Sequence, residues 1–177
     1  DLKNLDKFVI EGGRKLSGEI RVGGAKNAAL PILAATILCG GKCTIRGVPA
    51  LRDVDTMCEI LGVLGMRVER NADAITCEID DEKKNTAPYE LVNTMRASVC
   101  VLGPLLAKRR SARVSHPGGC TIGVRPIDLH LKGMQSLGAK IDIEHGYIEA
   151  SARKLKGADI YLGGAYGSSV TGTENVM

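Results

Sequence analysis

Two glycine-rich segments hold the residues that are best suited to chemistry. The first is Gly23-Gly24-Ala25-Lys26-Asn27, between an expected strand and an expected helix. Free backbone N–H groups and the positive end of a helix attract anions at such a place, and Lys26 adds a full charge. The segment indicates a phosphate or carboxylate site, and a tight turn with a solvated lysine explains the same pattern equally well.

The second segment runs from His116 to Pro126 with the sequence HPGGCTIGVRP. It lies between a strand and a helix, so we expect an exposed loop that carries Cys120 close to Arg125. Nearby cations lower the pKa of an exposed thiol, which can then act as nucleophile or general acid. The alternative is a surface loop with an idle thiol. Because Lys26 and Cys120 both precede helices, we expect them to meet at one cleft.

Three further charged or titratable residues are candidates for this cleft. Arg96 interrupts an apolar helical pattern from Glu90 to Lys108, where a fixed cation either has an acidic partner or lines a site. Asp128 and His130 follow Arg125 at the start of the next expected helix. An aspartate there either stabilises the first helical turn or accepts hydrogen bonds from a ligand.

The composition narrows the class of protein. The chain has 177 residues, of which 44% are hydrophobic and 25% charged, which is typical of a soluble globular protein. Aromatic residues are only 3% and the net charge is +4, so single-stranded and duplex nucleic acid are poor partners. The longest apolar run, residues 28–39, is too short to span a bilayer, and no signal-like N-terminus is present. We therefore expect a cytoplasmic protein without a membrane anchor.

The cysteines and histidines do not have the spacing of a metal site. Six cysteines and three histidines occur, without a CxxC motif. Cys39, Cys58 and Cys100 lie in apolar helical patterns, where cysteine behaves as a small buried hydrophobe. We expect neither a metal nor an organic cofactor.

An internal repeat determines the expected architecture. An offset of 73 residues carries Pro31 onto Pro104, Arg52 onto Arg125 and Gly65 onto Gly138. The same offset holds through two helical stretches and a strand, which indicates two copies of one supersecondary unit.

Each copy is expected to contain an apolar helix, a strand, an amphipathic helix and a hairpin. The predicted helices are 26–39, 90–108, 53–64 and 127–137, and the predicted strands are 42–46, 66–70, 74–78, 112–115, 139–143, 147–150 and 160–162. The first helix of each copy is apolar nearly all round and should lie at the centre with strands outside. The fold class is thus α/β (α+β), an inside-out α/β barrel of about two and a fraction units. The opening of a third buried helix at 173–177 suggests a fragment of a longer protein.

Four motifs, GGAKNAALPILAA, TMRAS, PGGCTIGVRPIDLH and LKGADIYL, resemble the N-terminal half of the UDP-N-acetylglucosamine enolpyruvyl transferases. The resemblance covers almost the whole chain, with the motifs in the same order. It implies two inside-out barrels of three units each. Residues 23–177 would be the first barrel, incomplete at its third unit, and strands in residues 1–22 would belong to the missing C-terminal domain.

The resemblance also implies roles for residues. Cys120 would protonate phosphoenolpyruvate and be the target of fosfomycin, and Lys26 and Arg125 would meet its phosphate. The residues implied to contact phosphoenolpyruvate or the sugar nucleotide are Lys26, Asn27, Arg96, Arg125, Pro126, Ile127, Asp128, Leu129 and His130.

The implied reaction transfers an enolpyruvyl group from phosphoenolpyruvate to the 3-hydroxyl of UDP-N-acetylglucosamine with release of phosphate, at the start of peptidoglycan synthesis. It needs no cofactor. The general base and several arginines would lie outside this chain, so we expect at most weak ligand affinity and almost no turnover from it alone. Two departures from the family are His116 and a longer loop from Gly163 to Thr171.

Two other functions fit parts of the sequence. A non-catalytic domain or paralogue that binds a sugar nucleotide would keep the pocket without the chemistry. Enolpyruvylshikimate phosphate synthases share the fold, but they have Ser-Lys-Ser where this chain has Ala25-Lys26-Asn27, and they lack the Pro-Gly-Gly-Cys loop.

Overall fold

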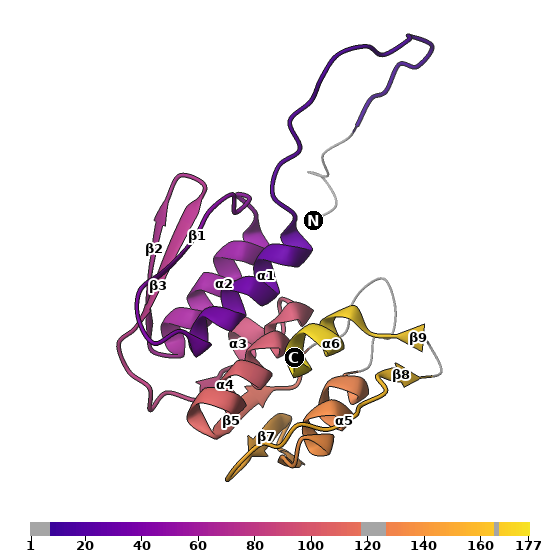
Figure 1. Cartoon of the computed structure of the whole chain (residues 1–177). Coiled ribbons are helices and arrows are strands. Elements are labelled where there is room, and N and C mark those ends of the chain that lie inside the picture. Colours follow the sequence, from indigo (N-terminus) through magenta and orange to yellow (C-terminus); the bar gives the residue numbers. More distant parts are fainter. Residues whose placement is uncertain (1–7, 118–126, 165–166) are drawn as a thin grey trace.

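The computed structural model describes residues 8–117, 127–164 and 167–177. The first repeat opens with helix α1 (Lys26–Ala35), which the 3-10 helix η2 (Thr36–Leu38) continues. Strand β1 (Cys43–Ile45), helix α2 (Arg52–Val63) and a hairpin of β2 (Met66–Asn71) and β3 (Ala74–Ile79) follow (Figure 1). These elements match the predicted helices and strands to within two residues.

The second repeat has the same order of elements after a short lead-in. The lead-in is β4 (Thr86–Ala87) and α3 (Tyr89–Val92). The central helix is the 3-10 helix η3 (Arg96–Val101) continued by α4 (Leu102–Arg109). Strand β5 (Ser111–Ser115), helix α5 (Asp128–Ser136) and a hairpin of β6 (Lys140–Glu144) and β7 (Tyr147–Ser151) complete it.

A third segment begins in the same way. It contains the short strands β8 (Gly163–Gly164) and β9 (Gly167–Ser168), and then helix α6 (Val170–Val176). The predicted strand 160–162 is wrong, because these residues have neither helical nor strand structure. Figure 1 shows α6 beside α5, on the same side of the molecule as β8 and β9.

The sheets confirm the internal repeat. Their strand orders are β1-β3-β2 and β4-β5-β7-β6, so in each repeat the first strand pairs with the last. The hairpin register also repeats, because Arg67 pairs with Glu78 and, 73 residues later, Lys140 pairs with Ser151. Even the turns correspond, since Ala72 has φ 52° and His145 has φ 50°.

Glycine ends the amphipathic helix of each repeat, as predicted. Gly65 has φ +83° and Gly138 has φ +96°, a left-handed conformation that reverses the chain at a helix C-terminus. Gly65 has a second reason to be glycine, because a Cβ there would lie 2.3 Å from the carbonyl oxygen of Asp81. This close approach brings the end of the first hairpin back onto the end of α2.

The core is aliphatic and is built around the central helices. α1, η3, α4 and α6 pack against one another, and the two sheets lie outside them. Leu33, Ile37 and Leu102 are completely buried at the helix contacts, while Ile75 and Ile148 cover them from the sheets. Burying aliphatic side chains of this size stabilises the fold by about 1.5–3 kcal/mol each.

The predicted helix 90–108 is wrong as a single element. α3 ends at Val92, Met95 is extended with φ −146°, and a new 3-10 helix starts at Arg96. The hydroxyls of Thr94 and Ser98 donate to the carbonyl oxygens of Leu91 and Met95, a local pairing that competes with helix continuation. Arg96 therefore lies at the start of a helix and not in its middle.

The N-terminal arm, residues 8–25, contains neither helix nor strand and projects from the rest of the chain (Figure 1). Its apolar side chains are exposed, including Phe8, Ile10 and Val22. That residues 1–22 belong to another domain stays a prediction, and residues 1–7 lie outside the described residues. No helix within the described ranges is long and apolar enough to cross a membrane.

Candidate active site

A cavity of about 480 Å³ lies where three helices begin, and this volume is ordinary for a small-molecule site. α1 contributes Lys26 and Asn27, η3 contributes Arg96, and α6 contributes Val170 and Thr171. Its other lining residues are Leu30, Pro31, Asp53, Thr94, Met95, Ala97, Val99, Cys100 and Glu174.

The helices run away from this cavity in the same sense. Their later residues, such as Ala35, Pro104 and Met177, line a second cavity behind it. The N-terminal N–H groups and the positive dipole ends of α1 and η3 therefore face the first cavity together. This arrangement favours an anionic ligand, as the glycine-rich segment before α1 predicts.

The backbone just before α1 packs closely against the turn at Gly47. Its N-cap, Ala25, makes no side-chain cap, and the first turn has no acidic residue to neutralise the helix end. Gly24 packs against the turn at Gly47, because a Cβ on Gly24 would lie 1.9 Å from the Gly47 carbonyl oxygen. A glycine at this position thus permits a close backbone contact just before Lys26 and Asn27, which line the cavity.

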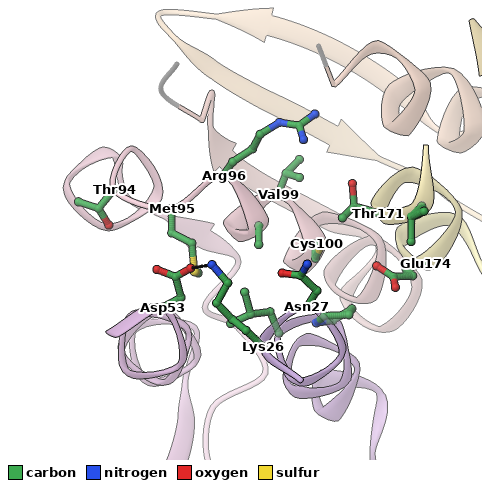
Figure 2. A pocket seen from close by; sticks show the side chains of 14 residues that line it. Lys26, Asn27, Asp53, Thr94, Met95, Arg96, Val99, Cys100, Thr171 and Glu174 are labelled. Carbon is green, nitrogen blue, oxygen red and sulfur yellow. Dashed lines mark hydrogen bonds and ion pairs between the residues drawn. The ribbon is translucent and has the colours of Figure 1, made fainter. Parts of the chain in front are cut away.

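The Lys26 ammonium has an acidic partner in the cavity wall. Its Nζ lies 2.7 Å from Oδ2 of Asp53, in the first turn of α2 (Figure 2). Both side chains remain partly exposed, at 45% and 36%. A pair this exposed is worth about 0–1 kcal/mol, so an incoming anion can displace it at little cost.

Asn27 and Arg96 lie on different parts of the wall. Figure 2 shows the Asn27 amide between Lys26 and Glu174, while the Arg96 guanidinium extends away from Lys26. The positive charge of Arg96 adds to the burial that lowers the pKa of His130, and it opposes the burial that raises the pKa of Cys100. The cavity thus has Lys26 at one side and Arg96 at another, a spacing suited to a ligand with more than one charged group.

The inner wall of the cavity is apolar. Leu30, Val99 and Cys100 are each less than 4% exposed. Burial raises the pKa of the Cys100 thiol to about 12, because the thiolate would lose its hydration. Cys100 is therefore a packed thiol, which agrees with its predicted structural role.

His130 lies behind the wall formed by α6. It is completely buried, and its Nε2 lies 3.4 Å from Oγ1 of Thr171 while its Nδ1 lies 3.0 Å from Nδ2 of Asn175. Asn175 also donates to the Val99 carbonyl oxygen and accepts from the Gly103 N–H. Burial lowers the pKa of His130 to about 4, and Arg96 adds to that effect.

The structure brings some of the predicted residues together. Lys26, Asn27 and Arg96 line one cavity. Ile127 is buried, Asp128 opens α5, and Leu129 and His130 follow on that helix, outside the residues that line the cavity. The ligand contacts implied for Ile127, Asp128, Leu129 and His130 stay predictions.

The predicted catalytic loop is not part of the described structure. Cys120, Arg125 and Pro126 fall in 118–126, outside the described residues. The first two residues of the predicted loop, His116 and Pro117, are described and follow β5. The backbone N–H of His116 donates to the Gly146 carbonyl oxygen. The meeting of Cys120 with Lys26 stays a prediction.

Sequence reasoning missed Asp53, Thr171, Glu174 and Asn175. Asp53 had one available signal, its place in the first turn of an amphipathic helix, where an acidic residue normally only stabilises the helix. Its partner, Lys26, is 27 residues away. Within the described ranges, no group of three or more His, Cys, Asp or Glu side chains is arranged to hold a metal ion.

Comparisons with known proteins show which family this chain belongs to. Curated relatives include UDP-N-acetylglucosamine 1-carboxyvinyltransferase of Desulfatibacillum aliphaticivorans, 54% identical over 173 residues, and of Geobacter metallireducens, 53% identical over 173 residues. Each match covers 98% of this chain but only 41% of the relative. The resemblance drawn from the four motifs is confirmed, and the chain spans about two fifths of the length of these relatives.

Solved structures share the fold at low identity. The enolpyruvyl transferase NikO from Streptomyces tendae has a TM-score of 0.64 at 22% identity, over 81% of this chain and 32% of that one. EPSP synthase from Acinetobacter baumannii has a TM-score of 0.65 at 16% identity, over 90% of this chain and 37% of that one. The predicted fold class is therefore confirmed. The EPSP synthase (3-phosphoshikimate 1-carboxyvinyltransferase) family matches residues 10–177, and the chain belongs to this family.

Proposed function

We propose that this chain forms the N-terminal part of an enzyme that transfers the enolpyruvyl group of phosphoenolpyruvate to the 3-hydroxyl of UDP-N-acetylglucosamine, releasing phosphate. One observation carries the proposal. The cavity at the start of α1, η3 and α6 combines positive helix ends with Lys26, Asn27 and Arg96. Relatives that are 50–54% identical bear the name of this activity.

The chemistry of the substrates fits these residue types. Phosphoenolpyruvate carries a phosphate and a carboxylate, so fixed cations and helix N-termini stabilise it. Lys26 would meet the phosphate, and the Asn27 amide would hydrogen-bond the sugar. The apolar inner wall at Leu30 and Val99 would exclude water from the reacting alkene.

The proton transfer is assigned to Cys120. A thiol near a cation can donate a proton to the methylene carbon while the 3-hydroxyl attacks the adjacent carbon. The resulting tetrahedral adduct loses phosphate from one carbon and a proton from the neighbouring methyl group, which the Cys120 thiolate would take back, to leave the enol ether. Arg125 would bind phosphate groups beside Cys120, and the general base would come from a part of the enzyme outside this chain.

The physiological setting follows from the proposed reaction. The product would be committed to peptidoglycan, so the protein would act in the cytoplasm, in cell-wall synthesis and cell division. Cys120 would be the target of fosfomycin, and a C-terminal domain would be the partner that completes the site.

Fosfomycin labelling tests the proposed function. The chain is incubated with fosfomycin with and without UDP-N-acetylglucosamine, and adducts are located by peptide mass spectrometry. We expect a single adduct at Cys120 that forms faster with the sugar nucleotide. Cys120→Ser is the matched control and should give no adduct. Labelling of Cys120 no faster than that of Cys39 contradicts the proposal.

Calorimetric titration distinguishes the alternatives. Binding of UDP-N-acetylglucosamine without a fosfomycin adduct supports a non-catalytic sugar-nucleotide domain, which the 41% coverage of the relatives keeps open. Binding of shikimate 3-phosphate in its place supports the activity that gives the family its description. We expect binding of the sugar nucleotide and none of shikimate 3-phosphate.

A further inference from the structure

Two aspartates in the first turn of α2 have different surroundings. Asp55 pairs with Arg70 of the first hairpin and lines a shallow depression with Cys58 and Glu59. Asp53 instead faces the active-site cavity and lies 2.7 Å from the ammonium of Lys26. A role in stabilising the helix end explains both residues, but it does not explain why only Asp53 engages the cation of the site.

The Lys26 side chain needs a second group to define its position. Lysine has a flexible four-carbon stem, and 45% of the Lys26 side chain is exposed. Within the described residues its ammonium contacts Asp53, which lies in the first turn of α2. The α1 end offers no acidic residue in its own first turn. The counter-charge therefore comes from the neighbouring helix.

We propose that Asp53 is a positioning residue that serves as the counter-ion of Lys26, holding the ammonium at the wall of the cavity until an anionic ligand displaces the carboxylate. This inference rests on the proposed function, in which Lys26 binds a phosphate. The exchange is a simple competition, in which an oxygen of the ligand replaces Oδ2 of Asp53 at Nζ.

If Asp53 and an anion compete for Lys26, removing Asp53 should increase both the reactivity of Nζ and the affinity for the anion. Without the carboxylate, Nζ is more available to reagents, and an anion no longer has to break an ion pair or approach a like charge. Exposed pairs change equilibria by a small factor, so we expect effects of about two- to five-fold. Salt screens exposed pairs, so added NaCl should reduce the difference between wild type and variant.

Acylation of Lys26 tests the counter-ion. The chain is treated with a trace of acetic anhydride, and the rate at each lysine is measured by peptide mass spectrometry. Asp53→Asn keeps the size of the side chain and removes its charge, so acylation of Lys26 should rise about two- to five-fold. Asp53→Glu should restore most of the protection. Lys140, which pairs with Asp142 at 2.9 Å, is the internal reference and should not change.

Asp55→Asn is the matched control. It removes the other first-turn carboxylate of α2 and costs the same helix-end stabilisation, but it should leave acylation of Lys26 unchanged. An unchanged Lys26 rate in Asp53→Asn, or an equal rise in Asp55→Asn, overturns the inference, because the effect would then belong to the helix and not to the pair.

Protection by inorganic phosphate tests the displacement. The phosphate concentration that halves acylation of Lys26 should be about two- to five-fold lower in Asp53→Asn than in the wild type. Equal protection in the two proteins overturns the displacement. The proposed function is tested separately by the fosfomycin adduct at Cys120. Failure of the Asp53 inference would leave that adduct unchanged, whereas failure of the proposed function would abolish it.

Discussion

The Nδ2 amide of Asn175 donates a hydrogen bond to Nδ1 of His130 across 3.0 Å, and this contact fixes the proton of the ring. The orientation of the amide is determined because its Oδ1 accepts from the Gly103 N–H. Nδ1 is therefore an acceptor and Nε2 carries the hydrogen, facing Thr171 in the cavity wall. A neutral, buried histidine thus joins α5 to α6, which lines the candidate-site cavity.

The free energy of unfolding should decrease as the pH is lowered, because of His130. Its pKa is about 4 in the folded chain, below the usual 6.5, so below pH 6.5 the unfolded chain binds a proton that the folded chain excludes. The stabilisation is complete above pH 6.5 and is lost as pH falls through 4. The difference between the two pKa values corresponds to about 3 kcal/mol in the free energy of unfolding. Urea unfolding between pH 7 and 4 measures it.

The His130→Asn variant separates this contribution from that of the carboxylates. Asn can place a carbonyl oxygen near the position of Nδ1 but does not titrate in this range. The decline in unfolding free energy from pH 6.5 to 4 should be smaller in the variant. Parallel curves for the two proteins would mean that His130 does not exclude a proton on folding.

Removing the Asn175 side chain should destabilise the fold strongly. Asn175→Ala removes the side-chain partner of the Gly103 N–H, of Nδ1 of His130 and of the Val99 carbonyl oxygen, which keeps only its bond from the Leu102 N–H. Unpaired buried polar groups cost about 1–3 kcal/mol each, although water entering the new space reduces the sum. We expect a loss of about 2–4 kcal/mol in urea unfolding. Thr173→Ala, on the exposed side of α6, should cost under about 1 kcal/mol.

The two helix-ending glycines should respond differently to alanine. Gly138→Ala introduces only the strain of a positive φ, about 1–2 kcal/mol, because the nearest atom to a new Cβ is 3.8 Å away. Gly65→Ala adds a collision with the Asp81 carbonyl oxygen and should cost about 1–3 kcal/mol more. Thermal or urea unfolding of both variants measures the difference. Equal losses would contradict the close contact at Gly65.

Cys100 should resist thiol reagents in the folded chain. Its thiol is 2% exposed, and burial raises its pKa to about 12. At pH 8 the thiolate fraction is lower than that of an ordinary cysteine by about three orders of magnitude. Iodoacetamide should therefore label half-buried Cys39 well before Cys100, and urea should abolish the difference. Early labelling of Cys100 would contradict the packed inner wall.

The regular parts of the fold were readable from sequence because their signals are local. Glycines 65 and 138 end helices through their own backbone conformation, and the 73-residue offset fixed both hairpins. The break at Met95 was not readable, because α and 3-10 helices place apolar residues at similar spacing.

The contacts at the candidate site were harder to predict for a different reason. Lys26 was recognised from its glycine-rich surroundings, whereas Asp53 and Asn175 acquire their roles from residues 27 and 76 positions away. Nothing in the sequence near Asp53 distinguishes it from Asp55, which pairs with Arg70. Only the packing of α1 against α2 and of α6 against η3 selects these contacts.

The repeat has a further consequence at the cavity itself. The 73-residue offset carries Lys26 onto Val99 and Asn27 onto Cys100, and all four side chains line the same space. The equivalent positions of the two repeats thus carry a polar pair in the first copy and an apolar pair in the second. At these two positions a ligand would therefore contact polar groups of the first repeat and apolar groups of the second.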